Sequence, residues 1–172
     1  MEYFRISSSA VLEICAQAKR GYETVQKQEE YGFLFGALPA DGHLHIKTAV
    51  PYRGGIRSRT MVDLDGATTK RRWRQLQRQL RSTFFGSYHT HVEIAGGVSA
   101  RLSEIDVQQF RSDSDARIEL LAVVWASNHR GLPPPLSKTL AGFDPASGYQ
   151  YRLKAYVKSD GRVKPVVLQV GA

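Results

Sequence analysis

The segment that most constrains the fold is the apolar run ELLAVVWA at residues 119–126, which polar residues bound on both sides. A run of this length that lacks apolar–polar alternation is typical of a central strand buried on both faces. Such a strand needs other strands beside it and helices over it. Helical patterns do interrupt this mostly β chain, so the sequence predicts an α/β or α+β fold in which helices pack on a sheet.

Helix, strand and turn signals divide the rest of the chain. Residues 9–27 follow a cluster of serines and carry apolar residues at i, i+3 and i+4 spacing, which predicts a helix with an N-terminal cap. Residues 31–38 and 43–52 flank Pro-Ala-Asp-Gly, whose Asp-Gly favours a tight turn, so they predict a hairpin. The further expected elements are a short strand at 60–65, an arginine-rich helix at 70–82, a strand at 83–92, a loop at 92–102, a helix from 103, a loop at 128–135, and strands near 136–144, 149–157 and 162–170.

Length and composition indicate one globular domain over residues 1–172. Hydrophobic residues make up 42% of the chain, no linker or repeat divides it, and no apolar run approaches the roughly 20 residues needed to cross a bilayer. The first residues lack the pattern of a secretory signal, so we expect a cytoplasmic protein. Cys15 is the only cysteine, which excludes an intrachain disulfide; inside a helical pattern it is expected to be a small buried hydrophobe.

The formal charge of +8 is compatible with an acidic partner. The densest basic run, residues 70–82, places Trp73, Leu76 and Leu80 on one helical stripe and leaves its arginines mostly on the solvated side. The chain carries none of the motifs typical of nucleic-acid-binding proteins. We therefore expect a solvated helix face and neither a membrane nor a nucleic-acid partner, with a basic nucleic-acid-binding module as a minor alternative.

Two histidines, His89 and His91, lie at the end of the predicted strand 83–92. Residues two apart on a strand point the same way, so both imidazoles can converge on one ion at Zn–N distances of about 2.0–2.1 Å. Alone, a His-x-His pair is more often incidental than a metal site. His43 and His45 form a second such pair, but no carboxylate of matching context follows it, and we expect an exposed strand pair there. His129 is expected in a loop.

Ser103 and Asp106 stand at the start of the next predicted helix. They fit a helix N-cap with an acidic third position. This role is compatible with metal ligation, because a carboxylate on the first helical turn is rigidly aimed. Two histidines and one carboxylate leave a fourth coordination position open, as in catalytic rather than structural zinc sites. Glu93 and Glu104 are less favoured substitutes for Asp106.

A metal-dependent hydrolase also needs a general base. Glu29, at the mouth of the first predicted strand in QEEYGFLFG, is a candidate, although Glu29 and Glu30 taken alone are typical charges at a helix–strand junction. With Glu29 included, the order Glu-x-x-Gly, His-x-His and Ser-x-x-Asp resembles the JAMM motif of the MPN+ (JAB/Mov34/PAD-type) zinc metalloproteases. The chain is similar to the prokaryotic stand-alone members of that family.

The resemblance implies that His89, His91 and Asp106 bind one zinc ion per chain, that Glu29 is the general base and proton shuttle, and that Ser103 stabilises the oxyanion. It implies an MPN-like, cytidine-deaminase-like three-layer sandwich, with a mostly antiparallel mixed central sheet flanked by helices. The implied reaction is hydrolysis after the C-terminal glycine of ubiquitin or a ubiquitin-like protein, in deconjugation or precursor processing. A bacterial ubiquitin-like conjugation or anti-phage operon is the expected setting. The alternatives are a non-catalytic MPN scaffold subunit and an enzyme that processes a sulfur-carrier protein.

Two features depart from the family pattern. Val92 follows the second histidine where the family usually has proline, and residues 92–102 form a longer connection to Ser103. The extra residues, with Gly96 and Gly97 among them, could form a lip over the site or could misplace Ser103. The longer connection bears on Ser103 more than on the metal, because all three ligand types are present.

Overall fold

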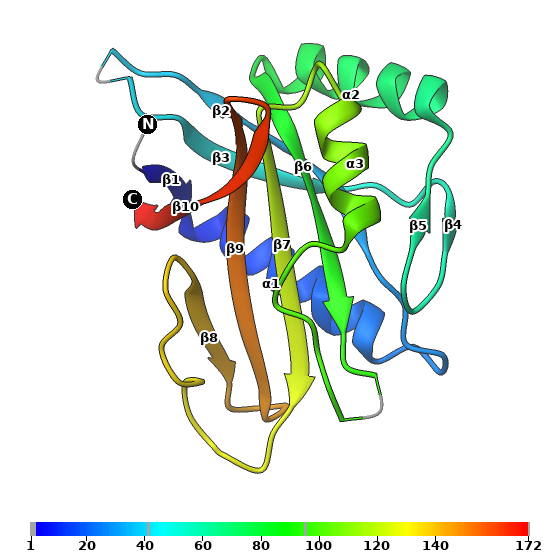
Figure 1. Cartoon of the computed structure of the whole chain (residues 1–172), viewed down its shortest axis with the longest axis vertical. Helices are drawn as coiled ribbons and strands as arrows, with labels where there is room; N and C mark the ends of the chain where they lie inside the picture. Colours follow the sequence, from blue (N-terminus) through cyan, green and yellow to red (C-terminus); the bar gives the residue numbers. More distant parts are fainter. Residues whose placement is uncertain (1–2, 41, 95, 172) are drawn as a thin grey trace.

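The computed structural model describes residues 3–40, 42–94 and 96–171 (Figure 1). Three helices and ten strands follow one another in these residues. They are β1 (Tyr3–Ser7), α1 (Ser8–Tyr22), β2 (Tyr31–Ala37), β3 (His45–Pro51), β4 (Ile56–Arg57), β5 (Val62–Asp63), α2 (Gly66–Leu80), β6 (Thr83–Val92), α3 (Glu104–Ser112), β7 (Ile118–Ala126), β8 (Leu140–Asp144), β9 (Tyr149–Ser159) and β10 (Arg162–Gly171).

The main sheet closes on itself. Its strands follow the order β10-β1-β3-β2-β6-β7-β9-β8, and β10 also pairs with β9, so seven strands form a closed barrel from which β8 extends. The pairs β1–β10, β1–β3 and β6–β7 are parallel, and the other pairs are antiparallel. The predicted three-layer sandwich of the MPN type is therefore wrong: the fold is a mostly β closed barrel with three short helices rather than a central sheet flanked by helix layers.

One strand that the sequence did not predict, β1, explains the difference. It pairs with β10 on one side, with Tyr3 opposite Val167, and with β3 on the other, with Ile6 opposite Ile46. Without β1 the remaining strands form an open sheet, which is what a sandwich requires. With β1 inserted between β3 and β10, the two ends of that sheet join.

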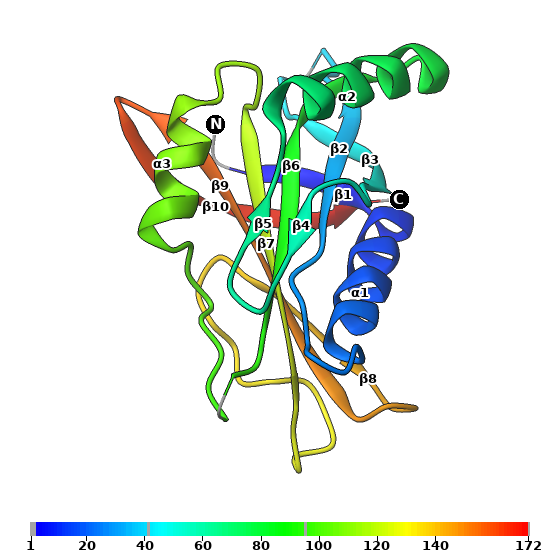
Figure 2. The ribbon, with the colours of Figure 1, turned by 90° about the vertical axis from the view of Figure 1, so that its right-hand side faces the viewer.

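The helices pack against the two faces of the sheet. In Figure 1, α1 lies behind β7 and β9, and Figure 2 shows α3 and α1 on opposite sides of β6 and β7. Side chains of α1 pack with those of Leu120 and Ala122 in the largest apolar cluster, whereas Leu121 and Val123 pack with Phe110 of α3. The apolar run of β7 is therefore covered on both faces, as predicted.

The arginine-rich helix α2 covers a third apolar cluster. Leu76 is buried against Phe33 and Phe35 of β2, and the Trp73 ring stacks on Phe84 with centroids 4.4 Å apart. The predicted apolar stripe is correct for these two residues, but Leu80, at the last turn, is exposed. The arginines of this helix lie on its exposed side.

Local signals set several element boundaries. The Ser7 side chain accepts a hydrogen bond from the Ala10 N–H and caps α1, which ends at Tyr22 rather than at the predicted residue 27. The predicted hairpin is formed by β2 and β3, although Asp41 of its turn lies outside the described residues. The pairing of β2 with β6 shifts register between Leu34 and Phe35, where Leu34 lies opposite Gly86. Gly86 has a φ of +152° and lies so close to the Ile118 backbone that a side chain would not fit.

None of the described helices is long and apolar enough to span a membrane.

Candidate metal centre

Two strand residues and one helix residue converge beside β6. His89 and His91 lie on the same face of that strand, and Asp106 comes from the first turn of α3. Asp106 Oδ2 lies 3.6 Å from His89 Nε2 and 3.5 Å from His91 Nε2. The three side chains are 8%, 11% and 19% exposed. Tetrahedral zinc with bonds of about 2.0–2.1 Å would separate its ligand atoms by roughly 3.3 Å, so the observed spacing suits one small ion.

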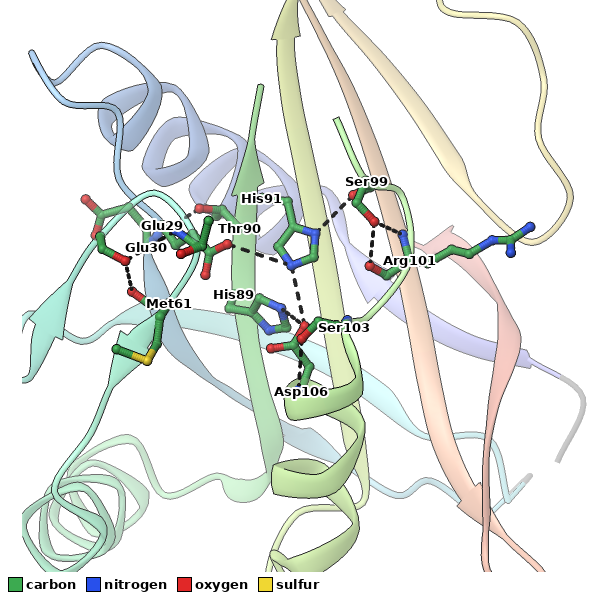
Figure 3. Close-up of polar contacts among 12 residues, drawn as sticks. Glu29, Glu30, Met61, His89, Thr90, His91, Ser99, Arg101, Ser103 and Asp106 are labelled. Atoms are coloured by element: carbon green, nitrogen blue, oxygen red, sulfur yellow. Dashed lines mark hydrogen bonds and ion pairs between the residues drawn. The ribbon is translucent and has the colours of Figure 1, made fainter. Parts of the chain in front are cut away.

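Helix capping fixes the direction of the Asp106 carboxylate. Its Oδ2 accepts a hydrogen bond from the Ser103 N–H at 2.7 Å, while the Ser103 hydroxyl accepts one from the Asp106 N–H at 3.1 Å. This capping box satisfies two N–H groups that the helix start would otherwise leave unpaired. The predicted cap and the predicted ligand are therefore the same group, which faces the two histidines while it holds the helix (Figure 3).

Acceptors behind the two imidazoles fix which ring nitrogen faces Asp106. His89 Nδ1 lies 2.7 Å from Glu119 Oε1, and His91 Nδ1 lies 3.0 Å from the Ser99 carbonyl oxygen. A carboxylate and a carbonyl only accept, so each Nδ1 must donate. In the neutral rings both Nε2 lone pairs then point at Asp106 Oδ2, and His89 Nε2 is buried without a hydrogen-bond partner in the described structure.

The electrostatics of this cluster favour a cation at its centre. Burial by itself opposes a charged His89 ring, but the Asp106 and Glu119 carboxylates outweigh it and raise the pKa of His89 to about 10. Burial likewise opposes ionisation of Asp106, yet the His89 and His91 rings hold its pKa well below the ordinary value. His89, His91 and Asp106 turn three acceptor atoms toward one another and have no lysine or arginine partner in the described contacts. Such a group can hold a metal ion.

Glu29 lies beside this cluster without belonging to it. Its Oε1 is 3.8 Å from His91 Nε2, and Figure 3 shows it approaching the same ring nitrogen that faces Asp106. Burial raises the pKa of Glu29 to about 7, and the two nearby histidines only partly offset that effect. A carboxyl group with that pKa can accept and release a proton near neutrality.

The neighbouring Glu30 has a different environment. Its carboxylate is buried and forms ion pairs with Arg20 at 2.9 Å and with Arg57 at 3.4 Å, pointing away from the metal ligands. Its backbone exchanges two hydrogen bonds with Thr90, the residue between the two histidines. The backbone of Glu30 therefore joins the start of β2 to β6, and Glu29 is the acid that faces the cluster.

The cluster opens into a groove of about 500 Å³. Glu29, His89, Ser103 and Asp106 line one part of it. Its other walls come from residues 60–64, which include β5, from the start of α2 and from α3. A bound chain could therefore lie along the groove and reach the candidate metal centre.

The other sequence candidates lie elsewhere. Glu93 accepts a hydrogen bond from Tyr22 at 2.6 Å, and Glu104 is exposed on α3, so neither replaces Asp106. His43 stacks on Tyr3 and, like His45, is half-buried rather than exposed, and neither joins the one cluster of possible metal ligands in the described structure. His129 is an exposed loop residue, as predicted.

The long connection between β6 and α3 is anchored at several points. Val92 is buried, Ile94 and Gly97 exchange two backbone hydrogen bonds, and Val98 packs against the cluster under α3. The Ser99 carbonyl on this segment accepts the hydrogen bond from His91. The extra residues thus reach a ligand of the cluster and lead to a Ser103 that caps α3.

Sequence reasoning missed Glu119. The apolar run 119–126 includes this residue without assigning it a role, whereas its side chain is buried and hydrogen-bonded to His89. The available signal was an acidic residue inside the strand next to the His-x-His strand, because parallel neighbours bring residues of one face together.

Comparison with known proteins identifies the fold alone. No protein-family model matches the chain, and no curated protein matches it. Among solved structures, it is similar to the solution structure of protein DSY2949 from Desulfitobacterium hafniense, with a TM-score of 0.61 and 14% sequence identity. The match covers 98% of this chain and 92% of that one. The two proteins share a fold at a sequence identity too low to carry activity from one to the other.

Proposed function

We propose that this protein is a zinc-dependent hydrolase that cleaves an amide or isopeptide bond after the terminal glycine of ubiquitin or a ubiquitin-like protein. One observation carries the proposal: His89, His91 and Asp106 turn three acceptor atoms toward one point, with the buried acid Glu29 beside them at the end of a groove. The order of these residues along the sequence, which resembles the JAMM motif, supports the choice of chemistry.

Zinc suits this set of ligands better than the other common divalent ions. Two imidazole nitrogens and one carboxylate oxygen are typical zinc ligands, whereas calcium and magnesium prefer oxygen alone. The set also leaves a coordination position open, as catalytic zinc sites do. When bound, zinc would polarise the scissile carbonyl and increase the acidity of water.

Glu29 would move the proton. We infer that water attacks the carbonyl directly, so that no acyl-enzyme forms, and that the Glu29 carboxylate accepts the proton of this water and passes it to the leaving amine. Its burial and its pKa near 7 support this role, because both protonation states are then accessible near neutral pH. Its position 3.8 Å from His91 Nε2 places the carboxylate next to the ligands without joining them.

Ser103 would stabilise the developing oxyanion. Its hydroxyl oxygen accepts the Asp106 N–H, which leaves the hydroxyl hydrogen able to donate toward the groove. A donor fixed by a helix cap needs little reorganisation in the transition state. The anchored 92–102 segment supports this role despite its length.

The substrate class follows from the groove and the motif together. The two-stranded sheet of β4 and β5 pairs only with itself in the described structure, so β5, whose residues line the groove, keeps one unpaired edge. An extended peptide tail can add to such an edge, and glycine lets the backbone approach the reacting atoms closely. Deconjugation or precursor processing in the cytoplasm, within a bacterial ubiquitin-like conjugation or anti-phage system, is the setting we propose.

The test uses fusions of candidate ubiquitin-like proteins that end in diglycine. We expect cleavage after the last glycine, and a fall in kcat of about 10²- to 10⁴-fold in Glu29→Gln with zinc retained. Glu104→Gln is the matched control, because this exposed acid on α3 lies outside the cluster, and it should keep full activity. A zinc-loaded protein that cleaves none of the fusions would favour the scaffold alternative instead.

A further inference from the structure

A third carboxylate, Glu119, stands behind the candidate metal centre. Its Oε1 accepts the His89 Nδ1–H at 2.7 Å, and its Oε2 accepts the Ser87 hydroxyl at 2.6 Å. The parallel pairing of β6 and β7 places Glu119 opposite Ser87, and His89 lies two residues further along the same face. Both carboxylate oxygens are therefore held, and the group has little freedom to turn away.

This arrangement is costly as a purely structural feature. Glu119 is only 6% exposed, and its one ion-pair partner in the described structure is His89. Burying a carboxylate that has neither a lysine nor an arginine partner is unfavourable, whereas an apolar residue would continue the apolar run of β7 at no such cost. A cation bound to the other side of the His89 imidazole would offset the cost of burying Glu119.

We propose that Glu119 is a positioning residue of the zinc site, which orients the His89 ring and strengthens it as a ligand. The inference rests on the metal binding of the proposed function. A carboxylate on Nδ1 fixes Nε2 as the atom that faces the metal and increases its electron-donating power. His91 has only the neutral Ser99 carbonyl at the equivalent place, so His89 is the stronger of the two nitrogen ligands.

The test measures zinc affinity by competition with a chromogenic chelator, together with the visible spectrum of the cobalt-substituted protein. Glu119→Gln can keep an acceptor for His89 Nδ1 and turn its NH2 group to donate to the Ser87 oxygen, but it lacks the charge. We expect it to bind zinc roughly 10- to 100-fold more weakly. Its cobalt spectrum should shift, because the ligand field of His89 changes. Ser87→Ala loosens only one carboxylate oxygen and should weaken zinc binding by a smaller factor, while Glu104→Gln should match the wild type.

The outcomes separate this inference from the proposed function. If the wild type binds zinc and Glu119→Gln matches it in both affinity and spectrum, the positioning role is refuted and the zinc site stands. If the wild type binds no zinc, both the inference and the proposed function fail. If metal-free Glu119→Gln does not fold, Ser87→Ala decides, and an unchanged affinity and cobalt spectrum in that variant refute the role.

Discussion

The neighbouring acids Glu29 and Glu30 should have opposite effects when each is changed to glutamine. Glu30 is 2% exposed and pairs with Arg20 and Arg57, so Glu30→Gln should destabilise the protein while the chemistry survives. Glu29 has no arginine partner among its described contacts, so Glu29→Gln should leave the stability intact. Because Glu29 is the proposed base, the same change should lower kcat by about 10²- to 10⁴-fold.

The magnitude follows from the two arginines. Arg20 is 36% exposed and can turn its charge to water, whereas Arg57 is 10% exposed and would stay buried without its partner. Removing one partner of a fully buried pair costs about 3–5 kcal/mol. Because only one of the two arginines is trapped, we expect a loss of roughly 2–4 kcal/mol for Glu30→Gln. For a chain of this size that loss lowers Tm by roughly 5–15 °C.

Urea unfolding of the zinc-free proteins, followed by circular dichroism, measures this difference. Zinc-free samples keep metal binding out of the comparison. A Glu30→Gln variant within about 1 kcal/mol of the wild type would refute the buried ion-pair account. If Glu30→Gln lost as much activity as Glu29→Gln, the assignment of the general base to Glu29 would be wrong.

Three further measurements test the fold. Burial raises the pKa of Cys15 to about 12, so its thiol should react with iodoacetamide at pH 8 far more slowly in the native protein than in urea, and equal rates would contradict the packing of α1. A Cβ on Gly86 would lie 1.9 Å from the Ile118 carbonyl oxygen, so Gly86→Ala should cost more than about 2 kcal/mol in urea unfolding. Ser7→Ala removes the cap of α1 and should cost about 1 kcal/mol, with an unchanged unfolding midpoint as the contrary result.

The sequence predicted most elements but not their closure. Local sequence patterns located β6, β7 and α2, because each of these elements carries a long one. It did not reveal β1, whose five residues run directly into a helix and pair with Val167 and its neighbours at the other end of the chain. Local patterns do not encode a pairing over that separation, so the barrel was mistaken for a sandwich.

The candidate site was more predictable than the fold for a physical reason. Metal ligands need particular residue types, and His89, His91 and Asp106 stand at spacings that reveal them. The motif order favours Glu29 over Glu30 from the sequence, but the two arginines that pair with Glu30 are known only from the structure. Glu119 was missed because its role depends on the parallel register of two strands.

The central claim is that one zinc ion binds at His89, His91 and Asp106. Metal analysis of protein purified from zinc-replete cells tests it most directly. We predict about one zinc per chain in the wild type and in Glu104→Ala, and almost none in Asp106→Ala, because the exposed Glu104 cannot replace the missing ligand. A wild type without zinc, or an Asp106→Ala variant that keeps its full zinc content, would contradict the account.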